Sequence, residues 1–191
     1  QHGARVLINN LHSDDARVGR VWPALVRRAL RENTAPAMRD VVCSAPLGSG
    51  HHYLLADPSN VCAVETSGTL RTVHFSGGAP FFVHTNHCLD PAVAAQSHVP
   101  AGSTTYERYD RLTALLAERP VTGALDAFTR LGDTQGFPRS VCVNLATPER
   151  PHLAATCAGL ALNLDRREVL MCAGMTNHVE PERILLNAPT M

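Results

Sequence analysis

Two short apolar runs, residues 53–56 and 61–65, are separated by only four residues, Asp57 to Asn60. These four are Asp, Pro, Ser and Asn, residue types that favour a tight turn. Strands joined by so short a connection pair antiparallel, because a parallel pair needs a crossover of about a dozen residues or more. The chain is therefore constrained to contain an antiparallel hairpin, which argues against a repeated strand–helix–strand design.

Apolar spacing predicts the remaining elements. Residues 4–11 form a strand-like run, residues 21–30 and 36–42 have helical spacing, and Thr34 is placed to cap the second helix. Further strands are predicted at 70–75, 81–85, 140–145, 156–164 and 168–173, and further helices at 106–118 and from 122 onward. This order predicts an α+β fold, with residues 1–191 forming a single domain.

Composition excludes several classes of partner. Hydrophobic residues make up 45% of the chain and charged residues 18%, which is typical of a folded protein. Lys plus Arg and Asp plus Glu both total 17 and are scattered, so neither nucleic acid nor an acidic membrane is an expected partner. We expect a small-molecule partner instead.

The cysteines and the apolar runs indicate the cellular compartment in which the protein is expected. Six cysteines are spread along the chain without a Cys-x-x-Cys pair, which favours free thiols in a reducing compartment. No apolar run approaches the roughly 20 residues needed to cross a bilayer, and residues 1–3 lack the features of a signal peptide. A cytoplasmic location is therefore predicted. The abrupt opening at Gln1 favours a fragment or a processed product.

A dense polar cluster follows the apolar residues Phe81 to Val83. Within it, the Asn86 side-chain amide can donate a hydrogen bond to a developing oxyanion. The plainer alternative is a polar strand end. A third interpretation is a metal site centred on His84, with His87 and Cys88 nearby, but residues three apart do not face one way on a strand. No metal is therefore expected.

The segment from Val83 to Leu89 reads Val-His-Thr-Asn-His-Cys-Leu. It resembles the signature of the acyl-coenzyme A:6-aminopenicillanic acid acyltransferase family and its related bacterial hydrolases. Other segments resemble the family in the same order along the chain, namely Gly3 to Val6 with Asn9, Leu11 and His12, then Arg108 and Arg111, then Phe137 to Cys142, and finally Ala155 with Thr156 and Arg166 to Glu168.

The resemblance implies an N-terminal-nucleophile hydrolase-like fold, a four-layer αββα sandwich, here lacking its first strands. Such proteins are made as precursors that undergo autoproteolysis just before a cysteine. That cysteine then attacks an amide or acyl thioester, and no cofactor is implied. By resemblance Asn86 is the catalytic oxyanion donor, and Asn9, His84 and His87 are candidate substrate-binding residues.

Two departures from the family pattern limit these expectations. Gln1 is not a cysteine and the chain contains no Gly-Cys dipeptide, so the nucleophile is expected upstream, on a missing N-terminal segment or chain. This chain alone is then expected to be inactive. The alternative is a nucleophile-free homologue acting as a non-catalytic binding module. His152 and Leu153 also replace the family's Ser-Arg pair, which favours an acyl-amine other than a penicillin.

Overall fold

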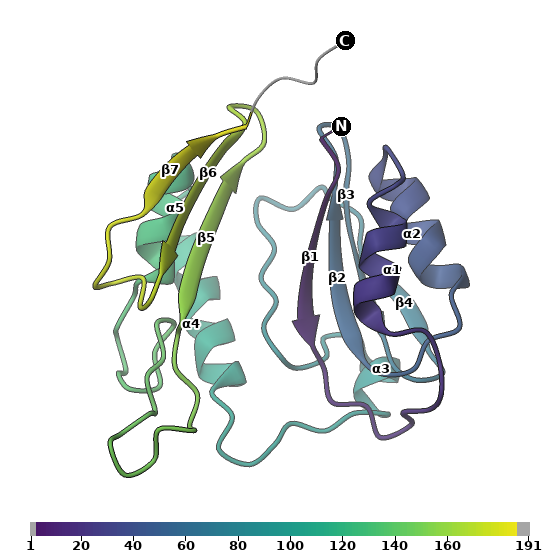
Figure 1. Cartoon of the computed structure of the whole chain (residues 1–191), viewed down its shortest axis with the longest axis horizontal. Helices are drawn as coiled ribbons and strands as arrows, with labels where there is room; N and C mark the ends of the chain where they lie inside the picture. Colours follow the sequence, from purple (N-terminus) through teal and green to yellow (C-terminus); the bar gives the residue numbers. More distant parts are fainter. Residues whose placement is uncertain (1–2, 187–191) are drawn as a thin grey trace. The chain divides into compact units, whose positions relative to one another are not determined.

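The turn at residues 57–60 joins β2 (His51–Ala56) to β3 (Val61–Thr66), as predicted, in a computed structural model that describes residues 3–186 (Figure 1). Asp57 holds this turn. Its Oδ1 accepts hydrogen bonds from the backbone N–H groups of Ser59 and Asn60, at 2.7 and 2.8 Å. Its Oδ2 accepts a third from the N–H of Ala35 at 2.6 Å. One carboxylate therefore ties the hairpin to the start of a helix.

The contacts within the chain divide it into two compact units, residues 1–103 and 104–191. The first contains a four-stranded antiparallel sheet in the order β1-β2-β3-β4, in which β1 spans Arg5–Asn10 and β4 spans Arg71–Phe75. Helices α1 (Trp22–Ala29) and α2 (Ala35–Ser44) cover one face of this sheet (Figure 1). The Thr34 hydroxyl accepts from the N–H of Ala37 at 3.3 Å and so caps α2, as predicted.

Strand alternation separates the two faces of this sheet. Tyr53, Leu55 and Val64 belong to the core beneath α1 and α2. The alternate residues therefore point to the opposite face. There Asn9, His52 and Glu65 form one cross-strand row, because His52 pairs with Asn9 of β1 on one side and with Glu65 of β3 on the other.

The strand predicted at residues 81–85 is wrong. This segment is irregular, and the short helix α3 (Pro91–Ala94), which was not predicted, follows it. The segment does not extend the sheet, and its Phe82 instead stacks on Phe75 of β4 with centroids 4.6 Å apart. Asp90 starts α3 by accepting from the N–H groups of Ala92 and Val93.

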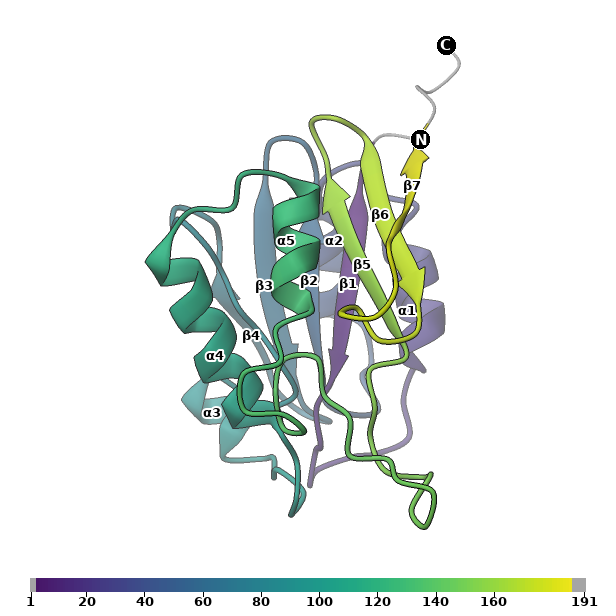
Figure 2. The same cartoon turned by 90° about the vertical axis from the view of Figure 1, so that its left-hand side faces the viewer.

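The second unit contains α4 (Thr105–Glu118), α5 (Ala124–Leu131) and an antiparallel sheet in the order β5-β6-β7. The strands span Ala158–Asn163, Glu168–Ala173 and Glu182–Leu185. Helix α5 lies against β5 and β6 (Figure 2), where Phe128 packs with Leu170 and Cys172. Both units thus combine helices with antiparallel sheets, which is compatible with the predicted α+β class.

The second unit differs from the sequence prediction in two respects. Residues 140–145 do not form a strand, and there only Asn144 makes an isolated bridge, to Ala155. Strand β7 was not predicted. Within residues 3–186, no helix has both the length and the apolar character needed to cross a membrane.

Replacing Asp57 by alanine should destabilise the first unit. The change leaves three backbone N–H groups without their acceptor, and an unsatisfied donor costs about 1–3 kcal/mol. Chemical denaturation should report a drop of that size in the free energy of unfolding. Asp40→Ala is the control, because Asp40 is 69% exposed and pairs only with Arg39 at the surface. Equal losses in both variants would contradict the role given to Asp57.

Candidate functional site

Glu65 is the centre of the polar cluster on the sheet face opposite α1 and α2. Its side chain is completely buried. Oε1 accepts hydrogen bonds from the N–H of Leu89 at 2.7 Å and from Nε2 of His84 at 2.8 Å, and Oε2 accepts one from the N–H of Asp90 at 2.8 Å. Burial raises the pKa of Glu65, but these hydrogen bonds outweigh it and hold that pKa below its ordinary value.

His84 lies between this carboxylate and its own backbone segment. Its Nδ1 is 2.7 Å from the carbonyl oxygen of Thr85. Its ring also stacks on that of His52, with centroids 3.6 Å apart and planes 5° from parallel. Only 2% of the His84 side chain is exposed. The segment that follows β4 is therefore held against the sheet by one ring with contacts on three sides.

Two further imidazoles complete the cluster. Nδ1 of His52 lies 2.9 Å from Oδ1 of Asn9, and the His74 ring meets the His52 ring edge-on at 5.6 Å. Burial, followed by the neighbouring His84 and His74, lowers the pKa of His52 to about 2, and burial also lowers the pKa of His74. Both rings are therefore neutral near pH 7. Their Nε2 atoms are buried and make no hydrogen bond to any residue in the range 3–186.

Asn86 lies two residues beyond His84 and is partly buried. Its side-chain Nδ2 donates to the carbonyl oxygen of Asn10, at the end of β1, over 3.2 Å. His87, which is 8% exposed, places Nδ1 at 3.1 Å from the hydroxyl of Thr85. These contacts connect Asn9, His84 and Asn86 near the end of β1, and His87 lies in the same segment as Asn86.

The sequence model of one protein family, acyl-coenzyme A:6-aminopenicillanic acid acyl-transferase, matches residues 1–177. The chain belongs to this family. A search among curated proteins returned no match. Membership in the acyltransferase family supports acyltransferase or hydrolase activity at the level of the family, and the matched region contains the whole cluster around Glu65.

One group of side chains in this acyltransferase-family chain has the composition of a metal site. His52, His74 and His84 each offer a ring nitrogen, and these atoms lie within 4.8 Å of one another. However, a metal lies in the plane of each imidazole that binds it, and one ion cannot lie in the two parallel planes of His52 and His84. Both nitrogens of His84 are also hydrogen-bonded already. The arrangement thus fits a hydrogen-bonded stack better than an ion.

Cys88 follows the cluster closely but lacks the character of a nucleophile. Its Sγ is 3.3 Å from the hydroxyl of Ser97, and burial raises the pKa of its thiol. A raised pKa disfavours the thiolate, which is the reactive form. Cys88 therefore gives no reason to revise the expectation that the family's nucleophile is a different cysteine.

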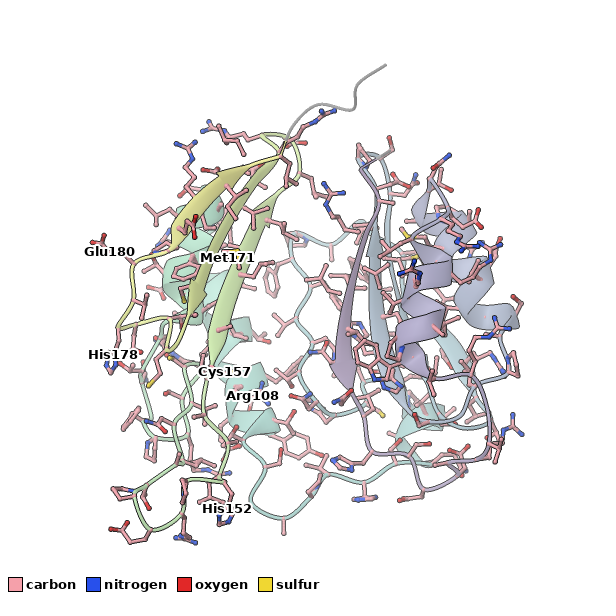
Figure 3. The ribbon with its side chains drawn as sticks, viewed as in Figure 1. Arg108, His152, Cys157, Met171, His178 and Glu180 are labelled. Atoms are coloured by element: carbon pink, nitrogen blue, oxygen red, sulfur yellow. The ribbon has the colours of Figure 1, made fainter. Side chains whose placement is uncertain are left out.

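The family-like arginines of the second unit are engaged within that unit. Arg108, on α4 (Figure 3), donates from Nε to the hydroxyl of Thr104 at 3.1 Å, and burial lowers its pKa. Arg111 makes two hydrogen bonds to Asp133, at 2.9 and 2.6 Å. His152 is exposed in the loop before β5 (Figure 3). The ion pair with Asp133 favours a structural role for Arg111.

The second unit also has an open groove of about 890 Å³ beside α5. The charged residues that line it include two ion pairs, between Arg119 and Asp126 and between Arg183 and Glu168. None of its lining residues is among the predicted site residues. We therefore place the candidate site at the Glu65 cluster of the first unit.

Sequence reasoning missed Glu65 and His52, which contact the segment that contains Asn86. Neither Glu65 nor His52 is among the site residues predicted from the sequence. A signal was present, because Asn9, His52 and Glu65 occupy alternate positions opposite apolar core residues on three neighbouring strands. That register is visible only once the strands are paired. The predicted substrate contacts of Asn9, His84 and His87 stay predictions.

Stability should fall as the pH drops below about 6.5. His52 is neutral in the folded chain, whereas in the unfolded chain it binds a proton below its ordinary pKa of 6.5. Each such histidine contributes a slope of up to about 1.4 kcal/mol per pH unit, and His51 and His74 also have lowered pKa values. Urea denaturation between pH 7 and pH 5 should show a shallower slope for His52→Phe. The exposed His178, replaced by phenylalanine, is the control (Figure 3), and an unchanged slope in His52→Phe would contradict the assignment.

We expect the histidine stack to retain no stoichiometric zinc. Binding would require one ring to leave the parallel stack and His84 to give up a hydrogen bond. Metal analysis after incubation with zinc and dialysis tests this, with His74→Asn as the matched variant. One zinc per chain in the unaltered protein, lost in His74→Asn, would favour a metal site instead.

Proposed function

We propose that this chain supplies the oxyanion donor and part of the acyl pocket of a self-processing cysteine acyltransferase or amidohydrolase. The observation that carries the proposal is the Asn86 amide, held at the end of β1 by its hydrogen bond to Asn10. A donor fixed in advance stabilises developing negative charge without reorganising during the reaction. Family membership supports the reaction class.

The proposed reaction uses an N-terminal cysteine. Its sulfur forms a bond to the carbonyl carbon of an amide or acyl thioester, while its proton passes to its own α-amine. The bond to the leaving amine or thiol then breaks, and the α-amine returns the proton to that leaving group. Water or an acceptor amine attacks the resulting thioester, which releases an acid or a new amide and restores the thiol. Asn86 donates to the oxyanion formed in both steps.

The cysteine is proposed to lie outside these 191 residues, on an N-terminal segment or chain that completes the site after autoproteolysis. Most of the thiols in this chain are poorly suited to act as the nucleophile. Burial raises the pKa values of Cys43, Cys62 and Cys88, and Cys142 and Cys172 are buried as well. Only Cys157 is exposed. This chain alone is then inactive.

The finer fold assignment is also a proposal. The first unit has α1 and α2 on one face of its sheet and the second has α5 on its sheet, which is compatible with the halves of a four-layer αββα sandwich of the N-terminal-nucleophile type. That the two units act as a single domain belongs to the same proposal. All six cysteines are free, which agrees with a reducing, cytoplasmic location.

The substrate is proposed to be a small acyl-amine or acyl thioester other than a penicillin, because His152 and Leu153 replace the family's Ser-Arg pair. The competing proposal is a nucleophile-free homologue that binds a ligand without turnover. The coding sequence upstream of Gln1 distinguishes the two. A Gly-Cys junction several tens of residues earlier supports the enzyme, and a start codon without one supports the binding module.

Replacing Asn86 by alanine in the complete protein should lower kcat by about 10²–10³-fold, the loss typical of one oxyanion donor. KM should change by no more than a few-fold, because the donor acts on charge that develops during the reaction. Steady-state kinetics on an acyl-amine substrate provide the measurement.

Two further variants sharpen this experiment. Asn86→Asp keeps the shape of the side chain but removes the donor, so its kcat should fall as far as that of Asn86→Ala. Asn144→Ala is the control, because Asn144 is also partly buried but lies in the second unit near Met175. Turnover within a few-fold of the unaltered protein in both Asn86 variants would refute the proposed role.

A further inference from the structure

We propose that Glu65 and His84 form a buried ion pair that positions the Asn86 segment, with Glu65 acting as a positioning residue rather than a catalytic one. The consequence for turnover rests on the proposed role of Asn86. The ion pair itself does not, because it follows from hydrogen-bond geometry alone.

The contacts of Glu65 bracket Asn86 along the chain. On one side the carboxylate holds His84, two residues earlier, and on the other it holds the backbone N–H groups of Leu89 and Asp90. A single rigid strand residue thus fixes both ends of a short irregular segment. This segment has no strand pairing of its own, and these contacts hold it against β3 on both sides of Asn86.

Proton counting assigns the charge on His84. A carbonyl oxygen can only accept a hydrogen bond, so Nδ1 of His84 donates to Thr85 and carries a proton. Glu65 already accepts two backbone N–H groups, which favours its ionised form, so Nε2 of His84 must also donate. With a proton on both nitrogens the ring is an imidazolium, and it lies against a carboxylate that carries the opposite charge.

The ring stacked on His84 is suited to a charged neighbour. His52 is neutral in the folded chain, so the 3.6 Å stack joins one cation to one neutral aromatic ring. Nδ1 of His52 contacts Oδ1 of Asn9. The next residue, Asn10, accepts the hydrogen bond from Asn86 through its carbonyl oxygen. These contacts therefore hold Asn86 in two ways, through β1 and through the Glu65–His84 ion pair.

Burial excludes a direct catalytic role for Glu65. Its side chain has no exposed surface, so it cannot touch a substrate. It acts through the geometry of the residues that it binds. Displacing a catalytic group by about 1 Å can cost on the order of 10²-fold in rate, so loss of the Glu65 contacts should appear mainly in kcat.

The test is Glu65→Gln, which keeps the size of the side chain but removes the charge. In the unaltered complete protein at pH 7, nitrogen NMR of labelled histidine should show both ring nitrogens of His84 protonated. In Glu65→Gln the ring should become neutral, and the amide signals of Asn86, Leu89 and Asp90 should shift. Turnover should fall on the order of 10–100-fold, with KM within a few-fold.

Two further variants are needed to interpret this result, a control and a variant that keeps the charge. Glu107→Gln makes the same chemical change at an exposed ion pair with Arg139 and should behave as the unaltered protein does. Glu65→Asp keeps the charge, so it should keep His84 doubly protonated and recover part of the lost turnover. It also replaces Glu65→Gln as the test variant if that variant does not fold.

Each outcome decides the matter. A neutral His84 in the unaltered protein would overturn the ion pair, and unchanged kcat in Glu65→Gln with altered NMR signals would overturn the positioning role. If Asn86→Ala also leaves turnover unchanged, then the proposed function fails, while the NMR signature still decides whether the ion pair exists. A uniform loss of folded signal in Glu65→Gln and Glu65→Asp alike would mean that Glu65 serves folding alone, and would overturn the proposal.

Discussion

The buried carboxylate of Glu65 is the constraint on which the first unit depends. An ionised group without exposed surface is tolerated only when hydrogen bonds and an opposite charge replace its lost hydration. All of its donors come from residues 84–90, so β3 and that segment require each other. Removing one partner of a buried pair typically costs about 3–5 kcal/mol, because the other charge is left uncompensated.

The same chemical device recurs at two other loops of this unit. Asp57 joins the β2–β3 turn to α2, and Asp15 accepts from the N–H groups of Gly68 and Thr69 and from the hydroxyl of Ser67, which joins the β3–β4 turn to the loop after β1. In both cases these hydrogen bonds outweigh burial and lower the pKa of the carboxyl group. The loops are thus fixed by carboxylates, one directly after β2 and one in the loop that follows β1, while the sheet itself is fixed by its core.

Local patterns were predictable, and long-range partners were not. The hairpin around Asp57 and the helix capped by Thr34 follow from turn residues and apolar spacing within about ten residues. The strand prediction for residues 81–85 fails because Phe81 and Phe82 fit a strand pattern, although Phe82 stacks on the ring of Phe75 in β4. The partners of Glu65 lie up to 25 residues away in sequence, beyond the reach of periodicity. Asn86 was found through family resemblance.

An ion pair that holds the Asn86 segment has a different electrostatic effect from a single charge in the same place. In the proposed site the opposite charges of Glu65 and His84 largely cancel at a distance, so a bound substrate would experience mainly the dipole of the Asn86 amide. A lone cation would attract any anion to the site, including a carboxylate product. A neutral donor on a rigid, charge-balanced base instead favours negative charge only where the amide points. With Asn86 as the proposed oxyanion donor, this arrangement would stabilise an oxyanion selectively, because the stabilisation would come from fixed geometry rather than from net charge.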